Sequence, residues 1–237
     1  MDVRGRGALV TGGTSGLGAA TVAALAAAGA EVAVADLHGP SPVDVTDDDA
    51  MGPLVASITD LRVLVCCAGI GSGGGKVVRR NGPHSLADFE RMVRVNLVGT
   101  FNAVRLAAWA MSRLEPTADG ERGVIVTTSS IAAFDGVTGG AAYSASKAGV
   151  AGMTLPLARD LGPLGIRVVS IAPGPMDTPM VEGMVPEFAA QLAAETPFPH
   201  RFGHPEEFAA LVAHVVANPL LNGEVIRLDG ATRMRPL

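Results

Sequence analysis

Aromatic residues and charges are scarce in this chain of 237 residues, and their scarcity narrows the classes of protein it can be. Only 4% of the residues are aromatic and 17% are charged, whereas 48% are apolar. A chain this apolar can bury enough surface to fold, which excludes intrinsic disorder. The formal net charge of −5 argues against a nucleic-acid-binding surface. We therefore expect residues 1–237 to form a single domain with a large core.

Cysteine and histidine are also rare, which argues against disulfide and metal chemistry. The two cysteines, Cys66 and Cys67, are adjacent. Neighbouring side chains on a strand point to opposite faces, so these two are not expected to form a structural disulfide. The five histidines are scattered without a metal-ligand spacing, and we expect no metal site.

Long apolar runs are missing as well. No stretch reaches the length of a membrane span, and the residues after Met1 lack the apolar core of a signal peptide. The sequence thus predicts a cytoplasmic protein that has neither a membrane nor a nucleic acid as a partner.

The chain has one tyrosine and two lysines, and it places one of each four residues apart. These are Tyr143 and Lys147; the other lysine is Lys76. The alanine-rich stretch around the pair has apolar residues at helical spacing, which predicts a helix over residues 141–161. Positions i and i+4 share one face of a helix, so the ammonium is expected to lower the phenol pKa from its usual value of about 10. Such a pair can move a proton onto or off an alcohol oxygen, although a core tyrosine beside a packed lysine stem shows the same spacing.

A glycine-rich turn follows the first predicted strand, residues 7–10, and precedes an alanine-rich helix that ends near Ala28. Its sequence, TGGTSGLG, starts at Thr11. Strand, glycine turn and helix form the setting of a dinucleotide-binding loop, because glycines let the backbone approach a pyrophosphate and the helix start offers free N–H groups. The spacing is GxxxGxG, not the more general GxGxxG, and a glycine turn alone is weak evidence for a nucleotide site.

The next predicted strand, residues 31–35, ends at Asp36, which lies 18 residues after Gly18. A carboxylate about 20 residues after the glycines can hold the adenosine ribose of a dinucleotide. It favours NAD, because it would repel the 2′-phosphate of NADP and neither Leu37 nor His38 supplies an arginine for that phosphate. The alternative is a solvated carboxylate at a strand end.

Only seven residues, 37–43, separate Asp36 from Asp44. A crossover between parallel strands needs a dozen or more residues, and Pro40 and Pro42 rule out a helix here. We therefore predict a sheet that is trimmed at this edge. The strand beyond the second one should be absent or very short, and the adenine of a bound dinucleotide should be unusually exposed.

Strands and helices alternate along the rest of the chain. Buried strands are predicted over residues 61–67, 123–128, 167–171 and 224–228, and a helix over 85–111 with Ser85 as its N-cap. This alternation predicts an α/β fold, a doubly wound parallel sheet of the Rossmann type. Residues 71–83 are expected to form a loop, and residues 176–200, rich in Met, Phe and Pro, a lid over the substrate.

Together these motifs resemble those of the short-chain dehydrogenase/reductase family over essentially the whole chain. The matching stretches are TGGTSGLG at Thr11, YSASK at Tyr143, PGPMDTP at Pro173, and single residues at Asp36, Asp44, Val45, Asn96 and Ser130. The resemblance implies that Tyr143 is the general acid/base and that Lys147 lowers its pKa and binds the nicotinamide ribose. It also implies that Ser130 polarises the substrate oxygen and that Asn96 holds a water in the proton relay.

The same resemblance implies which residues line the dinucleotide. The glycine turn would hold the pyrophosphate, and residues after the second strand would hold the adenosine. Further contacts would come from the end of the third strand and from the PGPMDTP motif. The implied set is Gly12, Ser15, Gly16, Leu17, Gly18, Asp36, Asp44, Val45, Cys67, Ala68, Gly69, Tyr143, Lys147, Pro173, Gly174 and Met176.

Within the family, the chain looks like the 3-hydroxyacyl-CoA dehydrogenases in the stretches AAYSASKAGVAGMTLPLARDLGPLGIRV, ETPFPHRFGHPEE and NPLLNGEVIRLDGATRM. That likeness, which includes an extra loop at residues 71–83, implies an NAD-dependent homotetramer of fatty acid metabolism. Its substrate would be an acyl-CoA or another small alcohol or ketone, whose oxygen meets Ser130 and Tyr143. The loop carries Lys76, Arg79 and Arg80, cations suited to the phosphates of CoA, or it is simply a solvated loop.

Flexible apolar side chains after Pro175 would suit acyl chains of variable shape. They are Met176, Met180, Met184, Val185 and Phe188. We expect this stretch and the 71–83 loop to face each other across the cleft and to close over a bound thioester.

Two other functions are compatible with these motifs. A 3-oxoacyl reductase, or a broad secondary-alcohol or steroid dehydrogenase, would share every catalytic residue. A non-catalytic scaffold subunit would keep the fold, although the intact set of Asn96, Ser130, Tyr143 and Lys147 argues against it. One departure from the family is Cys66, which stands where an Asn usually begins the strand-end Asn-(Asn/Cys)-Ala-Gly motif. It should alter local hydrogen bonding more than catalysis.

Overall fold

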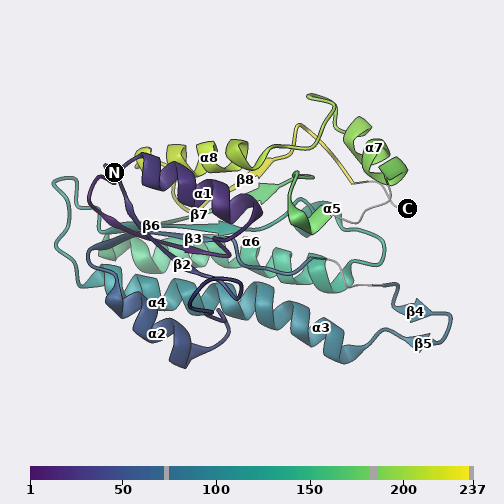
Figure 1. Cartoon of the computed structure of the whole chain (residues 1–237), viewed down its shortest axis with the longest axis horizontal. Coiled ribbons are helices and arrows are strands. Elements are labelled where there is room, and N and C mark those ends of the chain that lie inside the picture. The colour runs from purple at the N-terminus through teal and green to yellow at the C-terminus, as the bar shows by residue number, and fades with distance from the viewer. Residues whose placement is uncertain (72–74, 182–185, 235–237) are drawn as a thin grey trace.

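The computed structural model describes residues 1–71, 75–181 and 186–234. Its centre is a six-stranded parallel sheet in the order β2-β1-β3-β6-β7-β8. The order runs outward in both directions from β1 and β3, so the predicted doubly wound α/β fold is confirmed (Figure 1). The strands are β1 (Gly7–Thr11), β2 (Glu31–Ala35), β3 (Leu61–Cys66), β6 (Gly123–Thr128), β7 (Ile166–Pro173) and β8 (Val225–Leu228).

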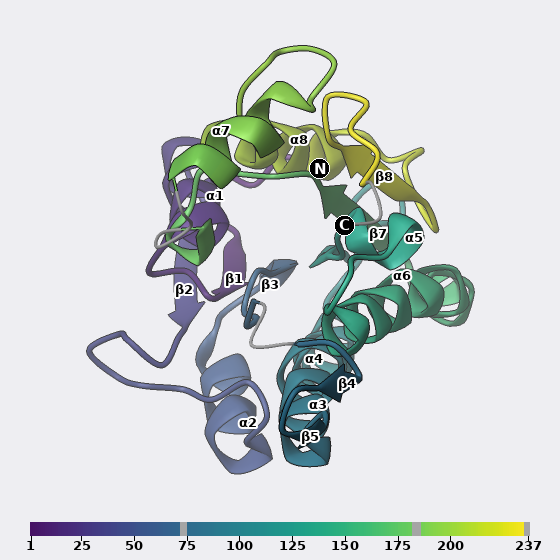
Figure 2. The same cartoon turned by 90° about the vertical axis from the view of Figure 1, so that its right-hand side faces the viewer.

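Helices cover both faces of this sheet (Figures 1 and 2). Helices α1 and α8 pack against each other on one face, and α2, α3, α4 and α6 lie on the other. The short α5 and α7 lie beyond the carboxyl ends of the strands. The bounds are α1 (Gly16–Ala27), α2 (Asp48–Ser57), α3 (Leu86–Val93), α4 (Thr100–Ser112), α5 (Ala132–Asp135), α6 (Ala141–Leu161), α7 (Pro186–Ala194) and α8 (Pro205–Ala217), with 3-10 turns at Gly162–Leu164 and Pro179–Val181. Among the described residues, no helix is long and apolar enough to cross a membrane.

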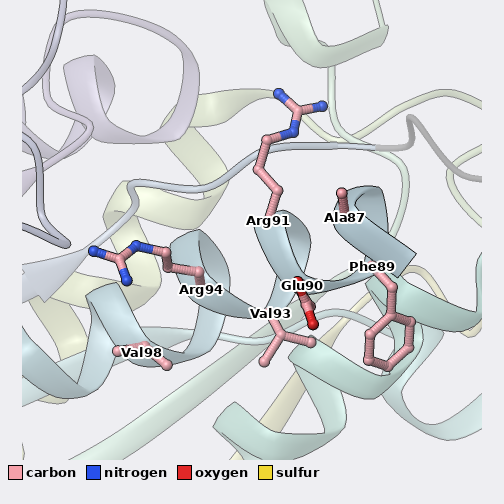
Figure 3. Close-up of a pocket in the computed structure, with 7 residues that line it drawn as sticks. All are labelled: Ala87, Phe89, Glu90, Arg91, Val93, Arg94 and Val98. Atoms are coloured by element: carbon pink, nitrogen blue, oxygen red, sulfur yellow. The ribbon is translucent and has the colours of Figure 1, made fainter. Parts of the chain in front are cut away.

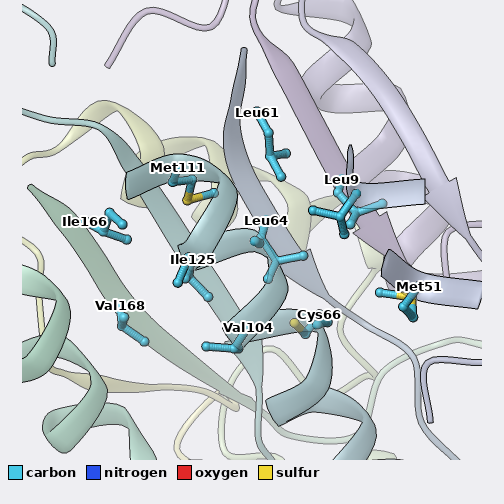
Figure 4. Packing of buried hydrophobic residues seen from close by; sticks show 14 of the residues in the cluster. Leu9, Met51, Leu61, Leu64, Cys66, Val104, Met111, Ile125, Ile166 and Val168 are labelled. Carbon is cyan, nitrogen blue, oxygen red and sulfur yellow. The ribbon is translucent and has the colours of Figure 1, made fainter. Parts of the chain in front are cut away.

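The strands are apolar on both faces, as a parallel sheet covered by helices requires. Leu9 and Leu64 belong to a buried cluster with side chains of α2 and α4 (Figure 4). Their neighbours Val10 and Val65 belong to a second cluster with side chains of α1 and α8. This alternation along each strand sets the two layers of the core.

The adjacent cysteines divide between these two clusters. Cys66, the last residue of β3, lies in the first cluster, and Cys67 packs against the second. Their side chains therefore point to opposite faces, as predicted, and both thiols are free. Burial raises the pKa of the Cys67 thiol to about 11 and raises that of Cys66 as well. Both thiols stay protonated near neutral pH, which makes them poor nucleophiles.

Strand β2 is the edge of the sheet, and in the described part of the chain no strand pairs with its outer side. Residues 37–43 contain no helix, and the loop closes through a hydrogen bond of 2.9 Å from Val43 N to Asp36 O. The predicted trimmed edge is confirmed. Because β2 pairs with β1 along its whole length, from Glu31 to Ala35, the missing crossover leaves the strand itself intact.

The helix predicted over residues 85–111 forms as one uninterrupted helical run from Leu86 to Ser112, but it is not α-helical throughout. Ser85 caps its start as expected, since its hydroxyl accepts a hydrogen bond of 3.2 Å from Asp88 N. A π-helical segment, Arg94–Gly99, then separates α3 from α4. The wider turn of a π-helical segment changes the spacing of the apolar residues too little to be recognised in the sequence. Such segments often occur at functional sites.

The loop predicted at residues 71–83 contains a hairpin of β4 (Val78–Arg79) and β5 (Gly82–Pro83). It projects beyond the start of α3 (Figure 1). Residues 72–74 lie outside the described chain. At the base of the hairpin, Gly75 N donates a hydrogen bond of 2.8 Å to Gly139 O, which ties the hairpin to the segment before α6.

Candidate active site

The predicted site residues lie at or just beyond the carboxyl ends of the parallel strands, where α/β folds of this kind bind ligands. The glycine turn follows β1, Asp36 follows β2, and Cys67 follows β3. Ser130 follows β6, and Pro173 is the last residue of β7. Residues that are far apart in the sequence therefore lie together at the carboxyl ends of the strands.

The glycine turn after β1 has no space for side chains at two positions. A Cβ atom at Gly12 would lie 2.6 Å from Ala68 N, and one at Gly18 would lie 1.9 Å from Gly12 O. The turn therefore presents bare backbone at the start of α1, where Ser15 is the N-cap residue and Leu17 packs on the core. This cradle suits the pyrophosphate of a dinucleotide.

Asp36 lies beside the glycine turn. One of its carboxylate oxygens accepts hydrogen bonds from Thr14 N at 3.0 Å and Thr14 Oγ1 at 2.7 Å, and the other accepts from His38 N at 2.9 Å. Partial burial would raise the pKa of Asp36, but the hydrogen bonds from His38 and Thr14 outweigh it and lower that pKa. The carboxylate is therefore ionised at neutral pH, and each oxygen keeps acceptor capacity for a ribose hydroxyl.

Asp44 and Val45 follow the short loop and lead into α2. Asp44 accepts a hydrogen bond of 2.8 Å from Thr46 N, which turns the chain toward the helix. Val45 is buried, and Asn102 Nδ2 donates to its carbonyl at 3.0 Å. Sequence reasoning missed Asn102, because a single asparagine inside an apolar helix pattern carries no recognisable signal.

Helix α6 places Tyr143 and Lys147 on one face, with Lys147 Nζ 5.9 Å from the centre of the tyrosine ring. The ammonium donates a hydrogen bond of 2.8 Å to Thr128 O at the end of β6. Ser130 follows two residues later and lies near Tyr143, whose pKa its side chain lowers. The structure thus brings together the serine, tyrosine and lysine that the sequence singled out.

The pKa shifts of this pair differ from the expectation. Burial raises the pKa of Tyr143, and hydrogen bonding to Ser130 offsets only part of that rise. Burial also lowers the pKa of Lys147 to about 8, because the ammonium is removed from water. The expected lowering of the phenol pKa by Lys147 is not seen, since the burial of both groups is the larger effect.

Asn96 lies in the π-helical segment and connects three parts of the site. Its Oδ1 accepts from Ile70 N at 2.8 Å, and its Nδ2 donates to Ile70 O at 3.1 Å and to Ser146 Oγ at 3.1 Å. Ser146 Oγ in turn donates to Tyr143 O at 2.8 Å. A Cβ atom at Gly69 would lie 3.1 Å from Asn96 Oδ1 and 3.7 Å from Lys147 Nζ, so the backbone after β3 runs between them.

Sequence reasoning passed over two serines that hold α6 in place. Ser146 links Asn96 to the helix, and Ser129 Oγ donates a hydrogen bond of 2.8 Å to Lys147 O. Both flank residues that were singled out, Ser146 within YSASK and Ser129 before Ser130. Their proximity to those motifs was the available signal.

The chain after β7 crosses the glycine turn. Gly174 N donates to Leu228 O at 2.9 Å, and Met176 is buried. A Cβ atom at Gly16 would lie 3.2 Å from Thr178 Cβ, and one at Gly71 would lie 2.8 Å from Met180 Cγ. The stretch after Pro175 therefore meets the start of the 71–83 segment. Met184, Val185 and the side chain of Phe188 lie outside the described residues.

The three cations that are expected to bind the phosphates of CoA lie on or beside the hairpin. Lys76, Arg79 and Arg80 are exposed, and within the described residues none of them makes an ion pair. The structure does not bring them into contact with the catalytic group. Across residues 1–71, 75–181 and 186–234, no set of three or more His, Cys, Asp and Glu side chains could hold a metal ion.

Two hollows lie outside the catalytic group. A cavity of about 140 Å³ lies behind Met176, between Arg201 and Asp229. A shallower depression of about 530 Å³ lies on the outer side of α3 and the π-helical segment, between Phe89 and Val98 (Figure 3). Neither hollow includes a catalytic candidate.

The geometry agrees with comparisons to known proteins. Residues 39–187 match the family described as short chain dehydrogenase. Two relatives, both named 3-hydroxyacyl-CoA dehydrogenase type-2, are 48% (Drosophila melanogaster) and 45% (Homo sapiens) identical; the alignments cover 96% and 99% of this chain and 97% and 98% of theirs. A crystal structure of 3-hydroxyacyl-CoA dehydrogenase type-2 from Mycobacterium avium is similar with a TM-score of 0.94 and 40% identity, and covers 98% of each chain. The chain therefore belongs to the short-chain dehydrogenase family of oxidoreductases.

Proposed function

We propose that this protein is an NAD-dependent dehydrogenase that interconverts 3-hydroxyacyl-CoA and 3-oxoacyl-CoA. The observation that carries the proposal is the 45–48% identity, over nearly the full length of both chains, to relatives with that name. The grouping of Ser130, Tyr143 and Lys147 at the end of β6 supports the reaction type. A carbonyl oxygen beside Ser130 and Tyr143 would meet two hydroxyl donors.

The protein residues supply orientation and a proton. A bound nicotinamide dinucleotide would supply or accept the hydride. During reduction Tyr143 gives its phenolic proton to the substrate oxygen, and during oxidation the phenolate takes a proton from the alcohol. Ser130 donates a hydrogen bond to the same oxygen, and the ammonium of Lys147 stabilises the phenolate as it forms. Asn96 holds the backbone at Ile70 and the start of α6 in register.

NAD is the proposed cofactor because of Asp36. Its carboxylate is ionised and lies at the glycine turn, where the adenosine ribose of a dinucleotide would lie. A 2′-phosphate in that place would meet a negative charge, which disfavours NADP. The bare backbone at Gly12 and Gly18 supports the same cofactor class.

The CoA end of the substrate is assigned to the hairpin. Lys76, Arg79 and Arg80 are exposed cations without ion-pair partners among the described residues, so they are free to meet phosphates. Close packing between Gly71 and Met180 supports the idea that the hairpin base and the stretch after Pro175 form two walls of one acyl slot. This stretch, residues 176–200, would act as the substrate lid.

The protein would work as a cytoplasmic homotetramer in fatty acid metabolism. Support for an oligomer comes from large apolar side chains that are exposed along α3, the π-helical segment and α4. Trp109 is 64% exposed, Phe101 46% and Val98 49%. Apolar surface gathered on adjacent helix turns is typical of a protein interface. Light scattering of the purified protein measures the number of subunits directly.

The experiment follows NADH absorbance with acetoacetyl-CoA and, in parallel, with a small CoA-free ketone. Replacing Lys76, Arg79 and Arg80 together with alanine should raise KM for the CoA ester several-fold, about 1 kcal/mol, while sparing the ketone. KM for the ester should also rise with salt in the wild type, because exposed charges are screened. Equal effects on both substrates would show that the hairpin does not read CoA and would favour a general alcohol or steroid dehydrogenase.

A further inference from the structure

The segment that leads from Ser130 to Tyr143 begins with the single helical turn α5. Ser130 Oγ accepts a hydrogen bond of 3.1 Å from Ala132 N, and Ser130 O accepts one of 3.0 Å from Ala133 N. The backbone and the hydroxyl of Ser130 are therefore both part of the first turn of α5. A shift of α5 would move the Ser130 hydroxyl with it.

Helix α5 cannot hold its own position. It has four residues, and one helical turn is not stable by its internal hydrogen bonds alone. Ala132 is buried, but the largest side chain of the turn, Phe134, is 53% exposed. The position of α5 therefore depends on its packing against α6 through buried residues such as Ala132, and on the contacts of its last residue, Asp135.

Asp135 is held by residues near the C-terminal end of the chain. Arg227 Nη1 donates to Asp135 Oδ1 at 2.8 Å, and Arg227 Nη2 donates to Asp135 Oδ2 at 2.9 Å. Met234 N adds a third hydrogen bond of 3.1 Å to Oδ2. The Asp135 side chain is only 11% exposed, so this paired, charge-assisted contact is shielded from solvent.

Arg227 is itself fixed before it reaches Asp135. Its Nε donates to Asp229 Oδ2 at 2.7 Å, and its Nη2 also donates to Thr232 O at 3.0 Å. The guanidinium lies 5.6 Å from the centre of the Phe134 ring. We call this group the C-terminal clamp: Arg227, Asp229 and the backbone of Thr232 and Met234, which together hold Asp135.

The clamp is also connected to β7, the strand to which the residue after Ser130 is hydrogen-bonded. Ile131 N donates to Pro173 O at 3.0 Å, and Pro173 pairs with Leu228, the residue after Arg227. The segment that starts at Ser130 is thus tied to β7 at Ile131 and to the clamp at Asp135. A third tie joins Gly139 O to Gly75 N shortly before Tyr143.

We propose that Arg227 and Asp135 are positioning residues for catalysis, which hold α5 so that the Ser130 hydroxyl and the Tyr143 phenol converge on one substrate oxygen. The proposal rests on the catalytic roles proposed above for Ser130 and Tyr143. Within the described residues, neither Arg227 nor Asp135 hydrogen-bonds to Ser130, Tyr143 or the glycine turn, so the clamp acts through the backbone of α5. A displacement of about 1 Å of a reacting group can cost up to about 100-fold in rate.

The test compares Asp135→Asn, Arg227→Lys and the double variant with the wild type, using acetoacetyl-CoA and NADH. Asp135→Asn keeps the size of the side chain but removes its charge, and Arg227→Lys keeps the positive charge but cannot donate two parallel hydrogen bonds to the carboxylate. We expect kcat to fall about tenfold or more, with KM for NADH nearly unchanged. The double variant should lose little more than either single variant, because both act on one contact. Asp135→Glu, which keeps a carboxylate, should restore most of kcat.

The pH profile separates positioning from general support of the fold. Hydrogen bonding to Ser130 lowers the pKa of Tyr143, so a displaced Ser130 should let that pKa rise. The alkaline limb of ketone reduction should then move to higher pH in the clamp variants. Hydrogen exchange at residues 131–140 should become faster in the same variants.

The matched control is Asp60→Asn, which lies just before β3 at the amino ends of the strands, away from the catalytic group. Like Asp135, Asp60 is a partly buried carboxylate that accepts from arginine, here from Arg6 Nη1 at 2.5 Å and Arg62 Nε at 2.7 Å, and asparagine tolerates its φ of +50°. When this variant and the clamp variants are compared under conditions in which the same fraction of each is folded, Asp60→Asn should keep the wild-type kcat and pH profile. Clamp variants that match it in kcat and pH profile would overturn the proposal, and so would unchanged exchange at residues 131–140, whatever the substrate. Failure of the proposed function shows differently, as a wild type that oxidises no NADH with acetoacetyl-CoA.

Discussion

The two sides of the candidate site are held in opposite ways. On the catalytic side, which we define as the π-helical segment, α5, α6 and the ends of β6 and β7, Asn96 and Lys147 are buried and hydrogen-bonded to neighbouring elements. On the adenine side, which we define as residues 36–47, Asp36 is only partly buried, and its partners are Thr14 and the backbone of His38. On the first side, side chains of the π-helical segment and α6 bond to one another and to the backbone at Ile70 and Thr128, whereas one short loop makes up the second.

This difference follows from what each side has to do. Proton transfer depends on small displacements of the reacting groups, so the catalytic side is cross-linked to its surroundings. Binding one end of a dinucleotide needs a carboxylate and bare backbone, and both survive when the crossover is shortened to seven residues. An edge strand such as β2 can lose its outer neighbour without losing its pairing to β1.

The largest expected effect is on the catalytic side. Tyr143→Phe removes the only phenol of the chain while keeping the ring, so turnover should fall by about 10²–10⁴-fold. Binding of NADH, measured by fluorescence titration, should stay nearly intact, because the cradle at Gly12 is unaffected. A variant with more than about a tenth of wild-type turnover would show that Tyr143 is not the general acid/base.

A second test uses the stability of the catalytic side. Burial lowers the pKa of Lys147 from 10.5 to about 8, so between these values the unfolded chain binds a proton that the folded chain has lost. The free energy of unfolding should therefore rise with pH across this window, by up to about 3 kcal/mol. The Lys147→Met variant has no ammonium at this position, so its free energy of unfolding should not show the increase with pH that Lys147 causes. Denaturant unfolding at pH 7.5, 9 and 10.5 measures the difference, and parallel curves for the two proteins would contradict the prediction.

The adenine side should show a smaller effect, confined to cofactor choice. Asp36→Ala removes the carboxylate that would accept from the ribose, so the affinity for NAD should fall about tenfold and the preference over NADP should narrow. Glu31→Ala, an exposed carboxylate at the other end of β2, is the control and should change neither affinity. A wild type that uses both cofactors equally well would refute the role given to Asp36.

The smallest effect is expected where the sheet is trimmed. With no helix in residues 37–43, the adenine of a bound dinucleotide should stay exposed on that side. Nicotinamide hypoxanthine dinucleotide, which changes only the base, should then bind within about threefold of NAD, a difference under about 0.7 kcal/mol. An affinity lower than that of NAD by a hundredfold or more would mean that the protein encloses the base, and would contradict the proposed difference between the two sides.

Local patterns in the sequence were sufficient for the strands, for most of the helices and for the pairing of Tyr143 with Lys147. Apolar runs and glycine turns act over a few residues, so they can be read without the fold. The trimmed edge was also predictable, because seven residues cannot span a crossover whatever surrounds them. The family resemblance named Ser130 and Tyr143 as members of one catalytic group, and in the structure the Ser130 side chain is near enough to lower the pKa of Tyr143.

Only the tertiary structure decided the contacts between elements that are distant in the chain. Ser146 reaches Asn96, and Arg227 reaches Asp135 across 92 positions of the sequence. It also reversed the expected pKa shift of Tyr143, because the burial that opposes the phenolate arises only when α6 packs against the end of β6. Spacing along one helix determines which side chains can meet, whereas their charge states depend on how much water the folded chain removes from around them.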